Sequence, residues 1–172
     1  MTFIGIDPGK DGGVAMLTTG VLWVHDTPTI KAGKGHRYNT AAMADLLRAE
    51  REDCFAVLEM ARAMPGQSSK TTAIQFHGIG LWEGILVALQ IPHVIITPQQ
   101  WRKLLIGGSP GAGIADKTAR TKALKASSFE CAARLWPAQA REFCGPKGGV
   151  KDGRVEAALL AEYGRRTVGG GT

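Results

Sequence analysis

The chain has 172 residues, 44% of them apolar, and its 21 Lys and Arg against 15 Asp and Glu give a formal charge of +6. This length and apolar content suit one folded domain and exclude a fully disordered chain. No run of about 18 apolar residues occurs, and no secretory signal precedes the first apolar segment, so we expect neither membrane association nor export. Three widely spaced cysteines form no disulfide framework or zinc motif and are typical of the reducing cytoplasm.

Short apolar segments and helical patterns alternate along the chain. Pro8-Gly9 ends the first apolar segment, and Thr19-Gly20 predicts a hairpin turn between the next two. A basic loop is expected over 27–38, and the continuous apolar run at 54–59 is typical of a strand buried on both sheet faces. In chain order we expect strands 2–7, 13–18 and 21–26, a helix from 39 or 40 to about 51, strand 54–59, helix 71–90, strand 93–97, and helices 98–105, 115–135 and 152–164.

Three strands in a meander, followed by alternating helices and strands, predict an α/β fold with a mixed β-sheet flanked by helices. No internal repeat or linker divides the chain, so we expect one domain over 1–166 and a fraying glycine-rich tail at 167–172. The segment 71–90 is apolar on more than one side. It is therefore either a core helix or a helix with one face on a second subunit.

The positive charge is concentrated in the C-terminal part. Residues 1–100 contain 8 Lys and Arg and 9 Asp and Glu, whereas residues 101–172 contain 13 and 6. This asymmetry indicates an anionic partner such as nucleic acid, the alternative being that the basic residues only solvate helices. The basic loop around 31–37 has the same two interpretations, a hold on a DNA arm or plain solubility.

Four carboxylates have positions that indicate chemistry. Asp7 and Glu59 each end an apolar strand, where a charge is costly unless it is paired or binds a cation. Asp152 and Glu156 are four residues apart and project from one face of the last expected helix. Carboxylate oxygens from two strand ends and one helix are the ligands that hard divalent cations such as Mg²⁺ prefer.

Each carboxylate also has a simpler interpretation. Asp7 could be a turn residue before Pro-Gly, and Glu59 could pair with Arg62. Asp152 could cap the last helix, with Glu156 complementing the positive end of that helix. The four together, in a chain with a basic half, favour phosphodiester hydrolysis in which two Mg²⁺ ions activate a water and stabilise the leaving oxygen.

Further residues are candidates for contacts with the DNA backbone. The loop after Glu59 is either a solvated loop or a DNA-contacting one. Trp101 is either a core residue or, beside two basic residues, a side chain that faces DNA. The candidates are Arg62, Gln67, Ser68, Ser69, Lys70, Trp101, Arg102, Lys103, Lys117 and Arg120.

Five segments, in order along nearly the whole chain, carry a family resemblance. They are Ile4-Gly5-Ile6-Asp7-Pro8-Gly9 with Gly12-Gly13-Val14-Ala15, Val57-Leu58-Glu59, Thr97-Pro98-Gln99-Gln100-Trp101-Arg102-Lys103, Asp116-Lys117, and Lys151-Asp152-Gly153-Arg154-Val155-Glu156-Ala157-Ala158-Leu159. Together they resemble the motifs of RuvC-type Holliday junction resolvases, especially the bacteriophage members. The resemblance implies an RNase H-like fold, a homodimer and paired symmetric nicks across a four-way DNA junction, in the host cytoplasm if the protein is phage-encoded.

The resemblance also implies roles for single residues. The metal ligands would be Asp7, Glu59, Asp152 and Glu156, which would hold two Mg²⁺ ions, with Mn²⁺ as a substitute and Asp7 between the two ions. Lys117 matches a basic catalytic position, while Arg102 or Lys103 would contact the backbone near the cut. Bacterial members carry an aromatic residue after the second acidic strand and this chain does not, so we expect cleavage of branched DNA more broadly.

Two other functions fit parts of the pattern. The segments Asp7-Pro8-Gly9 and Gly12-Gly13 also resemble the phosphate loop of actin-like sugar kinases and ATPases. However, 172 residues are too few for the second lobe that encloses a nucleotide, so no nucleotide cofactor is expected. The other alternative is a catalytically inactive branched-DNA-binding protein on the same fold, against which the intact acidic set argues.

Overall fold

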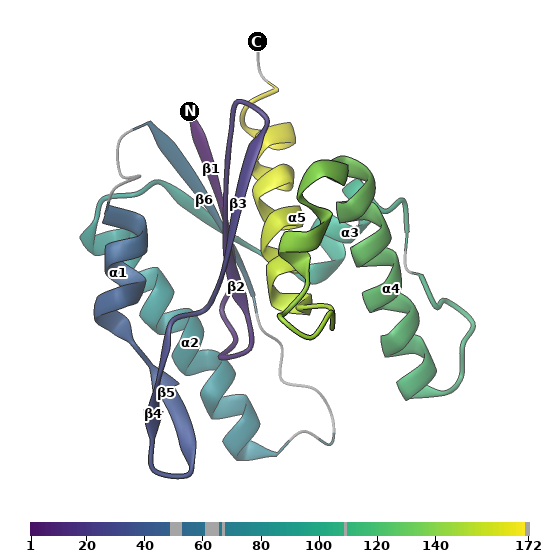
Figure 1. Cartoon of the computed structure of the whole chain (residues 1–172), viewed down its shortest axis with the longest axis horizontal. Coiled ribbons are helices and arrows are strands. Elements are labelled where there is room, and N and C mark those ends of the chain that lie inside the picture. Colours follow the sequence, from purple (N-terminus) through teal and green to yellow (C-terminus); the bar gives the residue numbers. More distant parts are fainter. Residues whose placement is uncertain (49–52, 61–65, 67, 109, 171–172) are drawn as a thin grey trace.

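The computed structural model describes residues 1–48, 53–60, 66, 68–108 and 110–170. In this part of the chain a five-stranded sheet lies between two groups of helices, and a two-stranded hairpin projects from one end (Figure 1). The strands are β1 (Thr2–Asp7), β2 (Gly13–Thr18), β3 (Val21–Asp26), β4 (Thr29–Ala32), β5 (Gly35–Tyr38), β6 (Cys54–Glu59) and β7 (His93–Ile96). The helices are α1 (Thr40–Arg48), α2 (Ser69–Ala88), α3 (Pro98–Leu105), α4 (Lys117–Leu135), the 3₁₀ helix η1 (Pro137–Phe143) and α5 (Asp152–Thr167).

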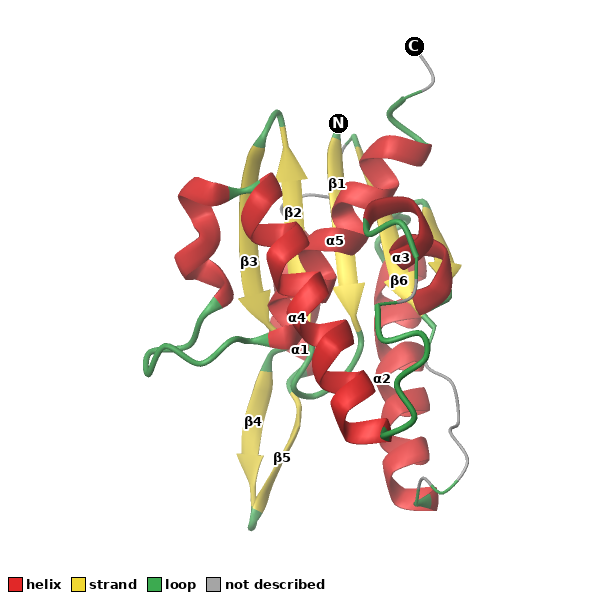
Figure 2. Ribbon diagram, turned by 90° about the vertical axis from the view of Figure 1, so that its right-hand side faces the viewer, coloured by secondary structure: helices red, strands yellow, loops and turns green. Residues whose placement is uncertain are grey.

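The sheet has the strand order β3-β2-β1-β6-β7, and Figure 2 shows β3, β2, β1 and β6 side by side. The β1–β2 and β2–β3 pairs are antiparallel, whereas β1–β6 and β6–β7 are parallel. Since Ile6 of β1 lies opposite Leu58 of β6, the carboxyl ends of these two strands meet at the same edge of the sheet. The predicted mixed sheet is confirmed.

Two hydrophobic cores form because β1 turns alternate side chains to opposite faces. Phe3 joins the core under α3, α4, α5 and η1, whereas Ile4 and Ile6 join the core under α1 and α2. The first core includes Trp101, Trp136, Phe143 and Leu159, and the second includes Met43, Leu47, Trp82 and Leu86. Burial on both faces explains why β1 and β6 are apolar nearly throughout.

Glycines allow α5 to lie unusually close to β1 and β2. A Cβ atom on Gly5 would lie 1.9 Å from the carbonyl oxygen of Ala157, and one on Gly153 would lie 2.4 Å from the carbonyl carbon of Gly12. The backbones of Gly12 and Gly153 form a parallel bridge at this point. Part of the glycine content therefore serves the contact that brings the first turns of α5 to the end of β1.

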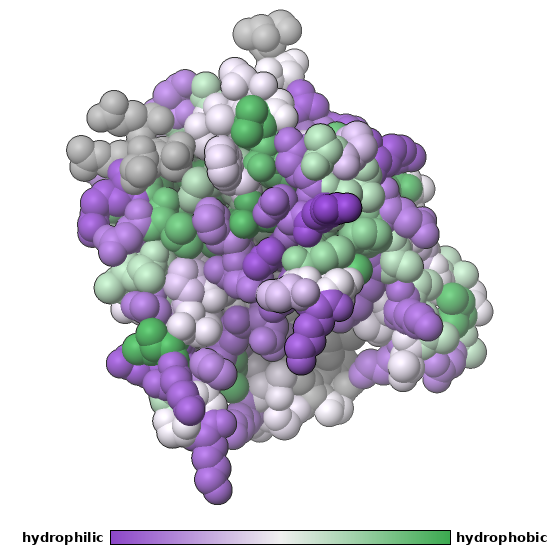
Figure 3. Space-filling model, in the orientation of Figure 1, coloured by the Kyte–Doolittle hydropathy of each residue, from purple (hydrophilic) through white to green (hydrophobic). Residues whose placement is uncertain are grey.

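One expected loop is wrong. Residues 27–38 contain the hairpin β4–β5, whose strands pair Lys31 with His36 and Ile30 with Arg37. These strands are short and mostly polar, so no alternating apolar face predicted them. Figure 3 shows hydrophilic side chains at the tip of this projecting part of the molecule.

The helix boundaries differ from the prediction where side chains cap the ends. Helix α2 starts at Ser69 because the Oγ of Ser68 accepts the N–H of Thr71 at 3.1 Å. Helix α4 starts at Lys117 because Asp116 caps it. Helix η1 was not predicted, and α5 extends to Thr167, so the tail starts later than expected. The predicted end of the first helix near Arg51 lies outside the described residues.

Within the described ranges, none of the helices combines the length and hydropathy needed to cross a bilayer. The longest of these helices, α2, has 20 residues, but it contains three glycines and polar residues such as Glu83.

A buried carboxylate at the end of α5 is held by two arginines. Glu162 is 3% exposed and accepts hydrogen bonds from Arg165 at 2.7 and 2.8 Å and from Arg166 at 2.8 Å. Burial alone would raise the pKa of Glu162, but these hydrogen bonds outweigh it and hold the pKa below its usual 4.5. The ionised carboxylate therefore stabilises the fold above about pH 4.5, and this stabilisation is lost as the pH falls through the lowered pKa.

We expect Glu162→Gln to lower the free energy of unfolding by about 1–3 kcal/mol at pH 7. Urea denaturation at pH 7 and pH 4 measures this difference, which should shrink at pH 4. The exposed Glu130→Gln of α4 is the control and should change stability little at either pH. If Glu162→Gln lowers the free energy of unfolding equally at both pH values, the negative charge of Glu162 is not the source of the stabilisation.

Candidate active site

Two strand ends bring two of the predicted carboxylates together. Asp7 ends β1 and Glu59 ends β6, each one residue beyond the paired Ile6 and Leu58. Because the strands are parallel neighbours, the two acids lie beside each other at one edge of the sheet.

Helix α5 adds the other two carboxylates. A cavity of about 580 Å³ is lined by Asp7, Asp152 and Glu156. An adjoining cavity of about 340 Å³ is lined by Asp7 and Glu59. The structure thus brings the four acids around two cavities that share Asp7.

Three of these carboxylates, Asp7, Glu59 and Glu156, resist ionisation together. Burial, and then the charge of Glu156, raise the pKa of Asp7 from 3.8 to about 7, although the N–H of Gly9, 3.3 Å from Asp7 Oδ1, acts against this rise. Burial, and then Glu156 and Asp7, raise the pKa of Glu59 from 4.5 to about 8. Burial also raises the pKa of Glu156, with Arg102 acting against it. A bound cation would relieve this repulsion.

Two cationic side chains are paired with the acids of α5. Lys125 Nζ lies 2.6 Å from Asp152 Oδ2, and Arg102 Nη2 lies 3.0 Å from Glu156 Oε1. In the described part of the chain, no three His, Cys, Asp or Glu side chains form a group that could hold a metal ion as they stand. The donor chemistry fits a hard divalent cation, since all four acids supply oxygen ligands. Such a cation would take over the positive charge that Arg102 and Lys125 supply.

Trp101 positions two charged groups of the site. Its ring is 0% exposed, its Nε1–H donates to Glu59 Oε1 at 2.7 Å, and the Arg102 guanidinium lies 4.7 Å from the ring centroid. The prediction that Trp101 faces DNA is therefore wrong, because packing against the core buries the ring. The alternative interpretation as a core residue agrees with the structure.

The structure also decides between interpretations of the α5 acids. Asp152 is the first residue of α5 and does not cap it; Lys151 has the capping position and makes no side-chain cap bond. Asp7 combines both of its interpretations, since it lines the cavities and also accepts the N–H of Gly9. The suggested partner of Glu59, Arg62, lies outside the described residues.

The predicted basic residues of α4 lie away from the acids. Lys117 and Arg120 are exposed in the first turn of α4, whereas the residue that reaches Asp152 is Lys125. Eight residues separate Lys117 from Lys125, which is about 12 Å along a helix. Lys125 is one of four basic residues spaced along this helix, with Lys117, Arg120 and Lys122, and nothing in that sequence pattern distinguishes it from its neighbours.

Some of the remaining residues predicted to contact DNA are exposed, and others lie outside the described residues. Ser68, Ser69 and Lys70 are exposed at the start of α2, and Lys103 is exposed on α3. Arg62 and Gln67 lie outside the described residues. The sequence did not identify Asp11, which lines the larger cavity and helps raise the pKa of Asp7.

Comparisons with known proteins support the fold. No protein-family model matches the chain, and no curated protein sequence matches it. The structure is similar to RuvC of Thermus thermophilus (14% identity, TM-score 0.55, covering 98% of this chain and 97% of that one). It is also similar to T. thermophilus RuvC in complex with a Holliday junction substrate (15% identity, TM-score 0.58, covering 96% of each chain). With the strand order above, this likeness shows the predicted RNase H-like fold.

Proposed function

We propose that the chain is a Mg²⁺-dependent, structure-selective DNA endonuclease that resolves four-way junctions by paired symmetric nicks. The observation that carries the proposal is the group of four acids around two adjoining cavities, with Asp7 shared and its pKa raised to about 7. The fold adds support, because one RuvC structure with the same fold contains a Holliday junction substrate. We take residues 1–166 as one nuclease domain and favour the phage-type, broad range of branched substrates.

In this proposal Asp7, Glu59, Asp152 and Glu156 hold two Mg²⁺ ions. Bound there, the metal would supply an activated water and charge stabilisation for the leaving oxygen. Trp101 keeps the Glu59 carboxylate in place through its N–H bond. Asp7 and Glu59 would be held as carboxylates by a bound cation, since their raised pKa values reflect burial and the repulsion of neighbouring carboxylates.

Two cationic side chains are suited to holding the phosphate. Lys125 lines the larger cavity and Arg102 the smaller one. Both are paired with α5 acids and would turn to the phosphate if a bound cation neutralised those acids. This assigns to Lys125 the role that the resemblance implied for Lys117.

The proposed enzyme acts as a homodimer, because paired nicks require two sites. Helix α2 offers an outward apolar surface, with Phe76 49% exposed and Val87 62% exposed, while its other face packs on the sheet through Trp82 and Leu86. Sedimentation at micromolar concentration should show a dimer. A monomer both with and without DNA would contradict this part of the proposal.

Labelled four-way, three-way and duplex DNA, incubated with Mg²⁺, Mn²⁺ or Ca²⁺, test the activity. We expect paired nicks in the four-way junction with Mg²⁺ or Mn²⁺, slower cleavage of the three-way junction and none of the duplex. Absence of both binding and cleavage would overturn the proposal.

A catalytically inactive branched-DNA-binding protein is the second candidate. It is favoured by the ion pairs Lys125–Asp152 and Arg102–Glu156, which neutralise two of the acids without metal. Tight junction binding without cleavage in any of the three metals would support it.

Replacing Lys125 with Ala is expected to slow single-turnover nicking about 10–100-fold, because a phosphate-directed cation is lost from the cavity. Lys117→Ala should cost less than Lys125→Ala, and the exposed Lys122→Ala of the same helix serves as the control. A larger loss for Lys117→Ala would favour the position that the resemblance implied.

A further inference from the structure

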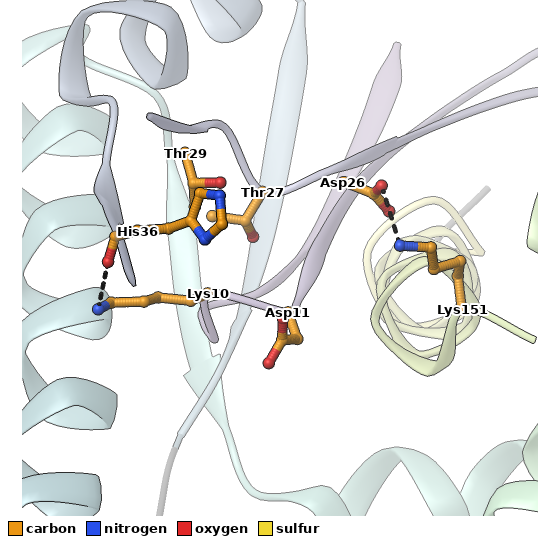
Figure 4. A pocket seen from close by; sticks show the side chains of 7 residues that line it. All are labelled: Lys10, Asp11, Asp26, Thr27, Thr29, His36 and Lys151. Atoms are coloured by element: carbon orange, nitrogen blue, oxygen red, sulfur yellow. Dashed lines mark hydrogen bonds and ion pairs between the residues drawn. The ribbon is translucent and has the colours of Figure 1, made fainter. Parts of the chain in front are cut away.

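A third pocket, of about 370 Å³, adjoins the proposed active site. Lys10, Asp11 and Lys151 line both this pocket and the larger catalytic cavity, so the two are continuous. The rest of its lining is Asp26, Thr27, Thr29 and His36. Figure 4 shows Lys10 on one side of the group, with its Nζ at the carbonyl of His36, and Lys151 on the other side, with its Nζ at Asp26.

We propose that this pocket binds a backbone phosphate of the DNA strand that leaves the active site. The inference rests on the proposed nuclease function and adds a second phosphate subsite to it. Three properties of the pocket carry it: an unsatisfied buried hydroxyl, a cationic balance, and its position at the base of the β4–β5 hairpin.

The hydroxyl of Thr27 is the first of these. Thr27 is 3% exposed, and its Oγ1 has no hydrogen-bond partner among the described residues. Its backbone N–H donates to the carbonyl of Gly12 at 3.0 Å, which fixes Thr27 against the loop that follows Asp7. A buried hydroxyl without a partner is unfavourable, and a phosphate oxygen, which only accepts, would satisfy it.

The charges of the pocket favour an anion. Asp26 is already neutralised, because Arg154 donates to it at 2.8 and 3.2 Å and Lys151 lies 3.5 Å away. Lys10 Nζ donates to the backbone carbonyl of His36 at 2.8 Å and so keeps its full charge for a ligand. Among the residues that line the pocket, Lys10 and Lys151 balance Asp11 and Asp26, and Arg154, which pairs with Asp26 from outside the lining, leaves the group with one positive charge in excess. His36 is a further donor of the lining.

The position of the pocket indicates a polymer and not a free anion. The hairpin projects from this end of the molecule, and Lys31, Lys34 and Arg37 are exposed on it (Figure 1). Tyr38, the last residue of the hairpin, donates its hydroxyl to the carbonyl of Pro8 at 3.1 Å and so ties the hairpin to the active-site loop. A strand that passes from the catalytic cavity through the pocket would continue along this basic hairpin.

The test uses four-way junctions in Ca²⁺, each with a single methylphosphonate near the cleavage point. A methylphosphonate removes one phosphate charge, and we expect one position, within about three phosphates of the cut, to weaken wild-type binding about 3–10-fold. The Thr27→Val protein should bind the unmodified junction about 3–10-fold more weakly than the wild type does. A methylphosphonate at the phosphate position that is sensitive in the wild type should not weaken binding by Thr27→Val any further. His36→Ala is a second variant with the same expectation, and Thr18→Val, at the far end of β2, is the matched control.

The stability of Thr27→Val separates binding from folding. Removing an unsatisfied buried hydroxyl should leave the DNA-free protein as stable as the wild type or more so, measured as the melting temperature. A lower melting temperature would show that the hydroxyl has an internal partner and would overturn the inference. So would the absence of any methylphosphonate position coupled to Thr27 or His36.

The wild type, with the unmodified junction in Mg²⁺, tests the nuclease function separately. Nicking by the wild type without any coupled methylphosphonate position removes the subsite alone. Failure of the wild type to bind or nick branched DNA removes the proposed function and the subsite with it.

Discussion

The Asp7→Asn protein is expected to nick a four-way junction at least about 10³-fold more slowly than the wild type in Mg²⁺, while binding the same junction in Ca²⁺ stays measurable. Asp7 lines both catalytic cavities, so this substitution removes one carboxylate oxygen and the negative charge that the two proposed cation positions share. Single-turnover cleavage of an end-labelled junction measures the effect. The exposed Glu83→Gln of α2 should cleave at the wild-type rate.

The same substitution should stabilise the metal-free protein. The pKa of Asp7 is raised from 3.8 to about 7 by burial and then by Glu156, so the ionised side chain opposes folding. The wild type therefore loses stability as the pH rises from about 4 through 7, and Asp7→Asn should avoid this loss, by about 2–4 kcal/mol at pH 8. Thermal unfolding in EDTA measures it.

Addition of Mg²⁺ should reverse this order of stability. Cation binding stabilises the folded wild type through its ionised acids, and it should stabilise folded Asp7→Asn less, because that protein lacks one of the charges. Cleavage by Asp7→Asn at the wild-type rate would contradict the proposed role of Asp7. Unchanged thermal stability in Mg²⁺ would contradict cation binding at the four acids.

Local signals were sufficient for most of the fold. The apolar run at 54–59 and Pro98 at the start of a helix predicted β6 and α3 directly, because burial and proline act through nearest neighbours in the chain. The hairpin β4–β5 was missed because strand pairing alone defines it, through partners such as Lys31 and His36 that share no apolar face.

Site residues could be predicted from the sequence only where their place at the end of a strand is enough to bring them to the site. Asp7 and Glu59 end adjacent strands, so a sheet brings them together whatever the details of packing. Lys125 and Trp101 depend on how α4 and α3 pack against α5 and the sheet, and that tertiary contact leaves no mark on a single sequence. Hence the lysine implied by the resemblance and the one that contacts an acid differ.

Gly5→Ala is expected to lower the free energy of unfolding by about 4 kcal/mol or more, and so to leave little folded protein. The new Cβ atom would lie 1.9 Å from the carbonyl oxygen of Ala157 and 2.4 Å from the nitrogen of Ala161. Both are backbone atoms of α5, so no side-chain rotation can relieve the clash. Urea denaturation and the yield of folded protein measure the effect.

Gly80→Ala is the matched control, because a Cβ atom at Gly80 in α2 meets nothing within 4 Å. Alanine favours a helix over glycine by about 0.8–1 kcal/mol, so this variant should be slightly more stable than the wild type. Any Gly5→Ala protein that folds must have moved α5 away from β1, and Asp152 and Glu156 with it. It should then nick junctions far more slowly than Gly80→Ala, whereas wild-type stability and cleavage in Gly5→Ala would contradict the close contact that brings the four acids together.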